Sequence, residues 1–303
     1  MNPLERAQLS LEGLSVGDAF GQKFFDQTDK VIANIKNRSL PPSPWYITDD
    51  SIMAIAIVEV LEKHGYIDQD ALADKFANYY KLNPKRGYGG TAHKILQSLN
   101  KGNHWKTVSH SVFDGLGSHG NGAAMRIAPL GAYYAEKIDE LISNAKLSAE
   151  VTHANIEGQI GALSIALAAA WAWNNRSNDT DGLELLNFVH TNIPDSDTRG
   201  KINKAIHLPL SYSIETAVSA LGNGSKMSSQ DTVPFCLWVT ARHIDNYENA
   251  IWSTVSALGD RDTTCAIVGG VLALKTGIDG IPAKWRQYRE PLDYWEQCFE
   301  EWS

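Results

Sequence analysis

Apolar residues recur at helical spacing along most of this chain, whereas the strict alternation of a half-buried strand is nearly absent. Near the amino terminus, Leu4, Ala7, Leu11 and Leu14 follow one another at intervals of three and four residues. This spacing places them on one face of a helix. Residues 50–63 are apolar almost all round until the last turn, a pattern typical of a helix buried in the middle of a globule.

The same patterns predict a chain built almost entirely of helices. They are expected over residues 4–16, 50–63, 68–80, 91–100, 122–134, 138–149, 155–173, 183–190, 199–206, 232–242, 246–256, 262–275 and 291–301. No fixed-period repeat, low-complexity tract or long linker separates them. We therefore expect one all-α domain over residues 1–303, compact and with helices that cross at varied, orthogonal angles.

Composition narrows the class of protein. With 43% hydrophobic and 20% charged residues, the chain can bury a large core. Its net charge of −8 argues against a nucleic-acid partner, which would need a basic face. The three cysteines are too few and too scattered for a disulfide framework or a thiolate zinc site, and they favour a reducing cytoplasm.

We find neither a targeting signal nor a membrane-spanning segment in the sequence. The first residues do not form a signal peptide. The longest apolar stretch, residues 160–173, is shorter than the about 20 residues needed to span a bilayer. The sequence therefore predicts a soluble, cytoplasmic protein with no membrane partner, which we expect to be a monomer.

Two acidic clusters stand immediately before apolar helices. Thr48-Asp49-Asp50-Ser51 precedes the helix at 52–61, and Asp260-Arg261-Asp262-Thr263-Thr264 precedes residues 266–274. The structural interpretation is helix capping, because a side-chain oxygen at a helix start accepts backbone N–H bonds. A cap, however, needs one side chain, and each cluster supplies two carboxylates with one or two hydroxyls.

Four carboxylates at the edge of a core would repel one another and would tend to take up protons. Two divalent cations would neutralise them, and an all-oxygen ligand set suits magnesium or manganese better than zinc. Whether the two clusters meet in space does not follow from sequence spacing. A diphosphate motif of the Asp-Asp-x-x-Asp type is disfavoured, because Met53 stands at its last position.

A glycine-rich run, residues 115–122, leads into the helix expected at 122–134. Its glycines would let a ligand approach the main chain, and free N–H groups at the helix start would face an anion such as a diphosphate. Ser118 and Asn121 would add hydrogen bonds. The alternative is an ordinary glycine-rich connection. The shorter run 86–90 is similar in kind, and Tyr88 in it offers a ring for stacking.

Residues 152–157, Thr-His-Ala-Asn-Ile-Glu, form a fourth feature at the start of the helix 155–173. Thr152 or Asn155 can cap that helix, and Glu157 suits its first turn. His153 by itself is most simply a structural histidine. It gains interest only from the other three features.

Taken in order, these motifs resemble the ADP-ribosylglycohydrolase family, which includes the dinitrogenase reductase-activating glycohydrolases. The likeness rests on Gly17-Asp18-Ala19-Phe20-Gly21, Thr48-Asp49-Asp50-Ser51, Gly120-Asn121-Gly122-Ala123-Ala124-Met125-Arg126, Thr152-His153 with Glu157, and Gly259-Asp260-Arg261-Asp262-Thr263. It runs from about residue 10 to about residue 280. Each motif alone is weak, and the five in this order are specific.

The resemblance implies an all-α fold with a cleft that holds two Mg²⁺ or Mn²⁺ ions. By matching positions, the metal ligands would be Thr48, Asp49, Asp50, Asp260, Asp262 and Thr263. Substrate would be bound by Tyr88, Gly89, Ser118, Gly120, Asn121, Gly122 and His153. Asp18 would support the centre.

The implied reaction is hydrolysis of the bond between ADP-ribose and a modified protein side chain. Asp49, Asp50 and Asp262 are the catalytic candidates, with Asp49 or Asp262 taking a proton from the attacking water. Phe24-Phe25 stand where some family members carry a Glu that takes part in catalysis and gating, so arginine-linked ADP-ribose is favoured over serine-linked. The alternatives are a non-catalytic ADP-ribose-binding protein and a hydrolase of serine-linked or O-acetyl-ADP-ribose.

Overall fold

The computed structural model describes residues 1–292, and all regular secondary structure in this part of the chain is helical. The α-helices are α1 (Pro3–Gln22), α2 (Thr28–Lys36), α3 (Asp49–His64), α4 (Gln69–Leu82), α5 (Gly90–Asn100), α6 (Trp105–Ser111), α7 (Ala128–Tyr133), α8 (Ile138–Glu150), α9 (Ile156–Asn174), α10 (Gly182–Asn192), α11 (Asp197–Ile206), α12 (Ile214–Leu221), α13 (Ser229–Arg242), α14 (Tyr247–Ser256), α15 (Arg261–Thr276) and α16 (Ala283–Tyr288), with 3₁₀ turns η1 (Asn121–Ala123) and η2 (Ile278–Gly280). The predicted all-α fold class is confirmed.

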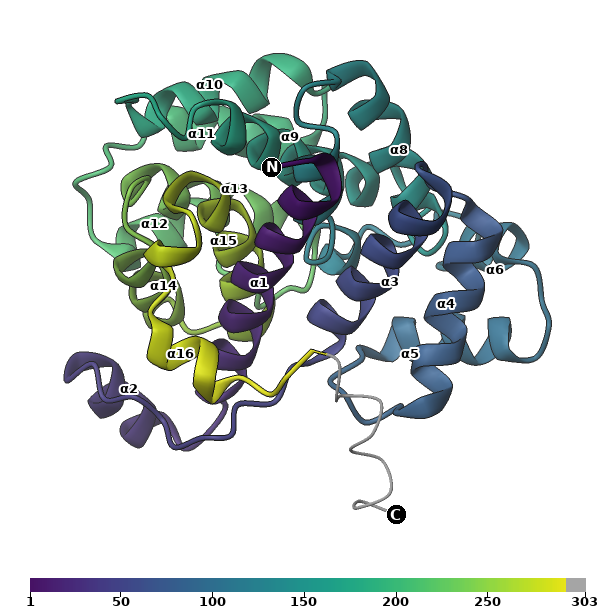
Figure 1. Cartoon of the computed structure of the whole chain (residues 1–303), viewed down its shortest axis with the longest axis horizontal. Helices are drawn as coiled ribbons and strands as arrows, with labels where there is room; N and C mark the ends of the chain where they lie inside the picture. Colours follow the sequence, from purple (N-terminus) through teal and green to yellow (C-terminus); the bar gives the residue numbers. More distant parts are fainter. Residues whose placement is uncertain (293–303) are drawn as a thin grey trace.

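Helix α9 lies in the core, in contact with α7, α8, α10, α13 and α15. Nearly every residue from Gly158 to Trp173 is buried. The run of alanines there lets neighbouring helices approach α9 closely, and the apolar surface buried is the main force that holds the layers together. In Figure 1, α9 and α10 lie on one side of α1, while α3 to α6 lie on another.

Helices α1 and α15 form the most extensive helix pair in the described chain. Three glycines of α1, Gly13, Gly17 and Gly21, face α15 at intervals of four residues. A Cβ at Gly17 would stand 2.2 Å from the carbonyl oxygen of Cys265, and one at Gly21 would stand 2.2 Å from that of Arg261. The two backbones therefore touch, and no side chain other than hydrogen fits between them.

This contact determines where the two acidic clusters lie. Helix α3 packs beside α1, as Figure 1 shows, and it also contacts α15. Because α1 touches both helices, their first turns, which carry the two clusters, are brought to the same region. Asp18 lies on α1 between Gly17 and Gly21, at this junction.

Most predicted helices are confirmed within a few residues of their expected ends. The prediction of one helix over 122–134 is wrong: the chain forms the 3₁₀ turn η1 and then the separate helix α7. Pro129 lies in the first turn of α7, where its missing N–H costs nothing, whereas in a helix interior it would remove a hydrogen bond. The helix expected over 291–301 falls almost wholly outside the described residues.

Four helices were not predicted: α2, α6, α12 and α16. They are short, and each buries few side chains; α2, for example, buries only Val31. Helix α1 is also longer than expected, since Gly17 and Gly21 continue the helix where glycine by itself suggests an end. Contact with α15 compensates for their low helix propensity.

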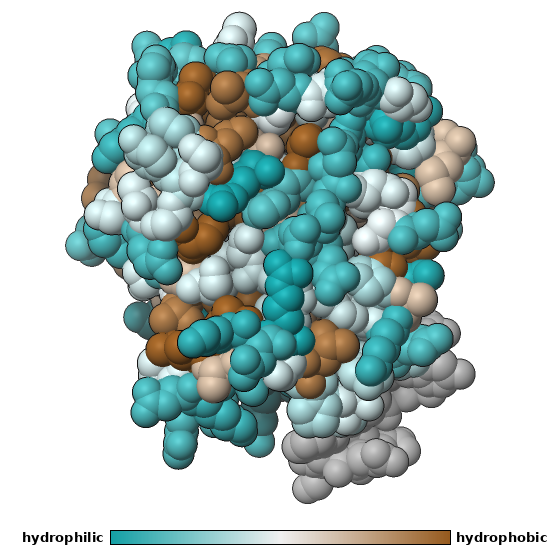
Figure 2. Space-filling model, turned by 90° about the vertical axis from the view of Figure 1, so that its left-hand side faces the viewer, coloured by the Kyte–Doolittle hydropathy of each residue, from teal (hydrophilic) through white to brown (hydrophobic). Residues whose placement is uncertain are grey.

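One face of the molecule is largely polar. Figure 2 shows a face on which hydrophilic residues predominate and apolar patches are separate from one another. No helix within residues 1–292 is long and apolar enough to cross a bilayer.

Candidate active site

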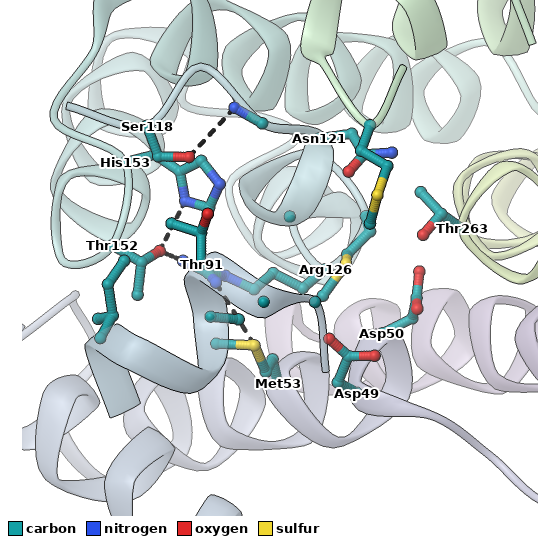
Figure 3. A pocket seen from close by; sticks show the side chains of 18 of the residues that line it. Asp49, Asp50, Met53, Thr91, Ser118, Asn121, Arg126, Thr152, His153 and Thr263 are labelled. Atoms are coloured by element: carbon teal, nitrogen blue, oxygen red, sulfur yellow. Dashed lines mark hydrogen bonds between the residues drawn. The ribbon is translucent and has the colours of Figure 1, made fainter. Parts of the chain in front are cut away.

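The acidic clusters line a single cavity of about 460 Å³. Asp49 and Asp50 come from the first turn of α3, and Asp260 and Asp262 come from the start of α15. Thr263 lines the same cavity, and Figure 3 shows it facing Asp50. The structure thus brings together two clusters that are some two hundred residues apart in sequence.

Helix capping does not account for these carboxylates. Thr48 is the N-cap of α3, and its hydroxyl accepts the N–H of Asp50, so neither aspartate is needed as a cap. Asp260 occupies the N-cap position of α15, yet its side chain accepts no backbone N–H there. It accepts instead from Asn121 Nδ2, at 2.7 Å. The surplus carboxylates therefore line the cavity, although Asp262 Oδ1 also accepts the backbone N–H of Thr263 at 2.9 Å.

Asp18 holds the first cluster in place from below. Its carboxylate accepts the backbone N–H of Thr48 at 2.8 Å, the Thr48 hydroxyl at 2.7 Å, and both the N–H and the hydroxyl of Ser51. Asp18 is fully buried and does not line the cavity. Asp18 thus supports Thr48 and Ser51 from α1, and its role beside a metal centre stays a prediction.

The Thr48 hydroxyl also lies 2.9 Å from Asp50 Oδ2. A hydroxyl has one proton, so it can donate to Asp18 or to Asp50 but not to both. The other Asp50 oxygen, Oδ1, is buried and has no hydrogen-bond partner. A buried, unpartnered carboxylate oxygen costs free energy unless it is protonated or meets a cation.

All five aspartates at this junction have raised carboxyl pKa values. Burial is the main cause, and it raises the pKa of Asp18 and of Asp260 to about 7. The pKa values of Asp49 and Asp50 lie well above the usual range, because burial is reinforced by the charges of the neighbouring aspartates. In the ionised form this cluster carries a large uncompensated negative charge.

The donor set fits divalent cations of the magnesium type. It consists of carboxylate and hydroxyl oxygens, which are hard ligands, and it includes the unpartnered Oδ1 of Asp50. Within residues 1–292, no three His, Cys, Asp or Glu side chains converge around one point. The carboxylates are instead spread over one cavity wall.

The glycine-rich loop forms another part of the cavity wall. Ser118, Gly120, Asn121 and Gly122 all line it. The predicted helix N-terminus is absent, and two of the N–H groups expected to face an anion are already used: that of Gly120 donates to Ser118 Oγ, and that of Asn121 donates to the carbonyl of Met227. The loop backbone instead packs closely against His153, since a Cβ at Gly122 would stand 3.3 Å from His153 Nε2.

His153 lies on the wall opposite the acidic clusters, as Figure 3 shows. Its Nδ1 is 2.7 Å from the hydroxyl of Thr152, which in turn accepts a hydrogen bond from Arg126 Nη2 at 2.9 Å. Burial, together with the positive charge of Arg126, lowers the pKa of His153 to about 3. The imidazole is therefore neutral at physiological pH.

A model of the ADP-ribosylglycohydrolase family matches residues 1–301 of the chain. The chain belongs to this family. It is 28% identical over 326 residues to the Homo sapiens protein ADP-ribosylhydrolase ARH3, with 94% of this chain and 89% of the human protein covered. To ADP-ribosylhydrolase ARH3 of Mus musculus it is 26% identical over 332 residues, with 96% and 89% covered.

A solved structure, described as an ADP-ribosylglycohydrolase-related protein complex, has the same fold as this family member. The TM-score is 0.68 at 22% identity, with 99% of this chain and 95% of the other covered. At this identity the likeness supports the fold alone.

Two residues of the site that the sequence predicted for this ADP-ribosylglycohydrolase do not line its cavity. Thr48 lies just behind the wall, with its hydroxyl bound to Asp18 and Asp50. The Tyr88 ring, which we expected to stack on the ligand, is buried against Tyr80 at a centroid distance of 5.1 Å. Tyr88 is therefore a core residue, although its neighbour Gly89 does line the cavity.

Glu157, which the sequence placed in one motif with His153, has a structural contact. Its carboxylate accepts the N–H groups of Asp197 and Thr198 and the Thr198 hydroxyl, so it caps the start of α11. The Phe24-Phe25 pair supplies no polar atom to the cavity: the Phe24 ring is buried among aromatic rings, and the Phe25 ring lies under the Arg261 guanidinium.

Several cavity residues were missed by sequence reasoning. Arg126 was quoted as part of a motif but was not proposed for the site, and Phe113, His119, Lys94 and Lys226 were not considered. Arg126 is the most informative, because it is 1% exposed and its guanidinium contacts Met53, Ser148 and Thr152. A lone arginine in a buried motif was the signal that could have identified it.

Proposed function

We propose that this protein is a metal-dependent hydrolase that cleaves the N-glycosidic bond between ADP-ribose and a modified protein side chain, with arginine as the preferred linkage. Family membership supports an enzyme that acts on ADP-ribose linkages. The observation that carries the proposal is the convergence of four carboxylates from α3 and α15 on one wall of a cavity whose other wall offers His153 and a glycine loop.

Each wall suits one end of such a substrate. Arg126, Lys94, Lys226 and His119 are basic groups of the cavity lining and suit the diphosphate. Asp49, Asp50, Asp260, Asp262 and Thr263 would hold two divalent cations, with Thr48 behind them. When bound, these ions would supply the positive charge that keeps the carboxylates ionised and the Lewis acidity that polarises the sugar.

In the proposed reaction, a water oxygen bonds to the anomeric carbon of the ribose while the bond to the arginine nitrogen breaks. Asp49 or Asp262 accepts the proton that the water loses. The arginine leaves as a neutral guanidine and then takes the proton that the aspartate accepted from water, so the products are ADP-ribose and the unmodified, protonated arginine. Gly120, Asn121, Gly122 and His153 position the nucleotide so that the anomeric carbon faces the carboxylates.

The arginine linkage rests on the chemistry of the cavity lining. Its only acidic residues within the described chain are the four aspartates. A serine linkage would leave an alkoxide that needs a proton from a further acid, and Phe24 and Phe25 offer none. An ADP-ribosylated arginine is already a guanidinium cation at neutral pH, so it can leave as a neutral guanidine without a further acid.

Substitution of Asp50 or Asp262 by Ala tests the enzyme and metal parts together. Both variants should lose bound magnesium or manganese and should lose ADP-ribose release from an arginine-modified protein, while the helical circular dichroism persists. Asp181→Ala is the matched control, since Asp181 caps α10 by accepting the N–H of Leu183 and is exposed. It should lose about 1 kcal/mol of stability and keep full activity.

A panel of arginine-, serine- and O-acetyl-linked ADP-ribose tests the linkage. Preferential turnover of the serine or acetyl conjugate would contradict the arginine assignment but not the proposal that the protein is a hydrolase. Binding of ADP-ribose in calorimetry without turnover of any conjugate would identify the protein as a non-catalytic binder. Cytoplasmic location and a monomeric state stay predictions.

A further inference from the structure

The hydrogen bonds behind His153 begin at Arg126, which fixes their direction. Arg126 is a guanidinium, which donates hydrogen bonds and cannot accept them. Its Nη2 donates to Thr152 Oγ1 at 2.9 Å and to the carbonyl of Ser148 at 3.2 Å. The guanidinium also lies over the Phe76 ring, 4.4 Å from its centroid, so its position is well defined.

The Thr152 hydroxyl must then donate its own proton elsewhere. Its second contact is His153 Nδ1 at 2.7 Å, and Thr152 is buried. If Nδ1 carried a proton, Arg126 and His153 would both donate to this oxygen, and the hydroxyl proton would be buried without an acceptor. The arrangement that satisfies both the Thr152 hydroxyl and the ring nitrogen has Nδ1 as the acceptor, so the imidazole proton is on Nε2.

The Nε2 atom faces the glycine loop of the cavity. Cβ atoms at Gly120 and Gly122 would stand 3.4 and 3.3 Å from it, so the glycines leave this nitrogen accessible. Figure 3 shows the hydrogen bonds among Arg126, Thr152 and His153 and the side of the ring that faces the cavity. Arg126 and His119 are the charged and titratable groups that act on His153, and both disfavour a second proton on the ring.

We propose that Arg126 and Thr152 are positioning residues that hold His153 as the neutral Nε2–H tautomer, so that it donates one hydrogen bond to a diphosphate oxygen of ADP-ribose. The choice of ligand rests on the proposed function; the choice of tautomer rests on the hydrogen bonds alone. A neutral donor binds the anion without a change of protonation, and it does not add a second buried positive charge beside Arg126.

Long-range ¹H–¹⁵N correlation spectra of ¹⁵N-histidine-labelled protein test the tautomer directly. The His153 signals are assigned by their loss in His153→Gln. In wild-type protein we expect a protonated Nε2 and an unprotonated Nδ1 between pH 6 and 8. A proton on Nδ1, or a doubly protonated ring at neutral pH, would overturn the inference, and this measurement does not depend on the folding of any Thr152 variant.

Thr152→Val and Thr152→Ser test whether the Thr152 hydroxyl sets the tautomer of His153. Valine has nearly the same shape but no hydroxyl, so Nδ1 loses its donor and the spectrum should show a mixture of tautomers. Calorimetry with ADP-ribose should give a Kd about tenfold weaker than wild type, the size expected for a weakened hydrogen bond to a charged group. Serine keeps the hydroxyl and should restore both the wild-type tautomer and an affinity within about threefold of wild type.

The inferred tautomer and the proposed function can be contradicted separately. A Thr152→Val protein with the wild-type tautomer and affinity would overturn the proposal that Thr152 positions His153. Wild-type protein that binds ADP-ribose with a proton on Nδ1 would contradict this inference alone, whereas wild-type protein that has the expected tautomer but binds no ADP-ribose would contradict the proposed function.

Discussion

The two walls of the cavity differ in how far their buried polar groups are satisfied by the protein itself. On the wall of His153, Thr152 and Arg126, donors and acceptors alternate in a continuous chain. On the wall of the four aspartates, acceptors face acceptors, and Asp50 Oδ1 has no partner. On the first wall the contacts from Arg126 Nη2 through Thr152 to His153 Nδ1 are satisfied, although Arg126 Nε has no partner; the second wall needs protons or cations.

This difference indicates what each wall contributes. The hydrogen-bonded series Arg126–Thr152–His153 is held in one arrangement and presents one donor to a ligand, so this wall suits recognition. A wall with surplus charge stores unfavourable electrostatic free energy, which a cation relieves on binding. The predictions below test this contrast, beginning with the largest expected effect.

Replacement of Asp50 by Asn should affect activity and stability in opposite directions. Turnover should fall at least about a hundredfold, because several kcal/mol of charge stabilisation are lost with a metal ligand. In chelator at pH 8, the melting temperature should rise above that of wild type, since one buried charge is removed. Scanning calorimetry and a turnover assay check both halves; a lower melting temperature would mean that the acidic wall is already satisfied without cations.

The stability of the metal-free protein should fall as the pH rises. The pKa values of Asp18 and Asp260 are raised from 3.8 to about 7 in the folded state. Between these values the folded protein binds more protons than the unfolded chain, so the free energy of unfolding decreases with increasing pH.

Melting temperatures in chelator should therefore drop by several degrees from pH 4.5 to pH 8. Millimolar magnesium should restore them at pH 8 and have little effect at pH 4.5, where the carboxyls are protonated. A melting temperature that is flat with pH in chelator would contradict the contrast between the walls.

Gly122→Ala should weaken ADP-ribose without affecting the metals. The new Cβ would stand 3.3 Å from His153 Nε2 and would crowd the nitrogen that faces the ligand. We expect the Kd to rise about tenfold, or about 1.4 kcal/mol, while bound metal is unchanged. The matched control is Gly200→Ala in α11, where the Cβ meets nothing within 4 Å; equal losses in both variants would show that the effect is not local.

The smallest effect is expected for Glu157→Gln. Glu157 belongs to the same sequence motif as His153, but its carboxylate caps α11. The variant should lose about 1 kcal/mol of unfolding free energy, as for other weakened caps, and should keep wild-type kcat and KM. A large loss of activity with unchanged stability would place Glu157 in the site after all.

The sequence predicted those helices that have a clear hydrophobic pattern of their own. Helix α9 was recognised because it is apolar all round, and α3 because an acidic, hydroxyl-bearing start precedes a long apolar run. It failed for α2 and α12, which are short segments that depend on the surface they cover. It also failed at residues 122–134, where Pro129 in the first turn of α7 was a local signal of a helix start.

In the same way, residue chemistry alone identified the surplus charge of Asp49, Asp50, Asp260 and Asp262, because the excess of acceptors over a helix cap can be counted along the chain. That these carboxylates share one cavity was decided by the tertiary structure. Gly17 and Gly21 allow the backbones of α1 and α15 to touch, and this contact brings the start of α15 to Asp18 and the start of α3. Tertiary packing likewise buried Tyr88, turned Glu157 toward α11 and placed Arg126 behind His153, because the direction of a side chain depends on which helices surround it.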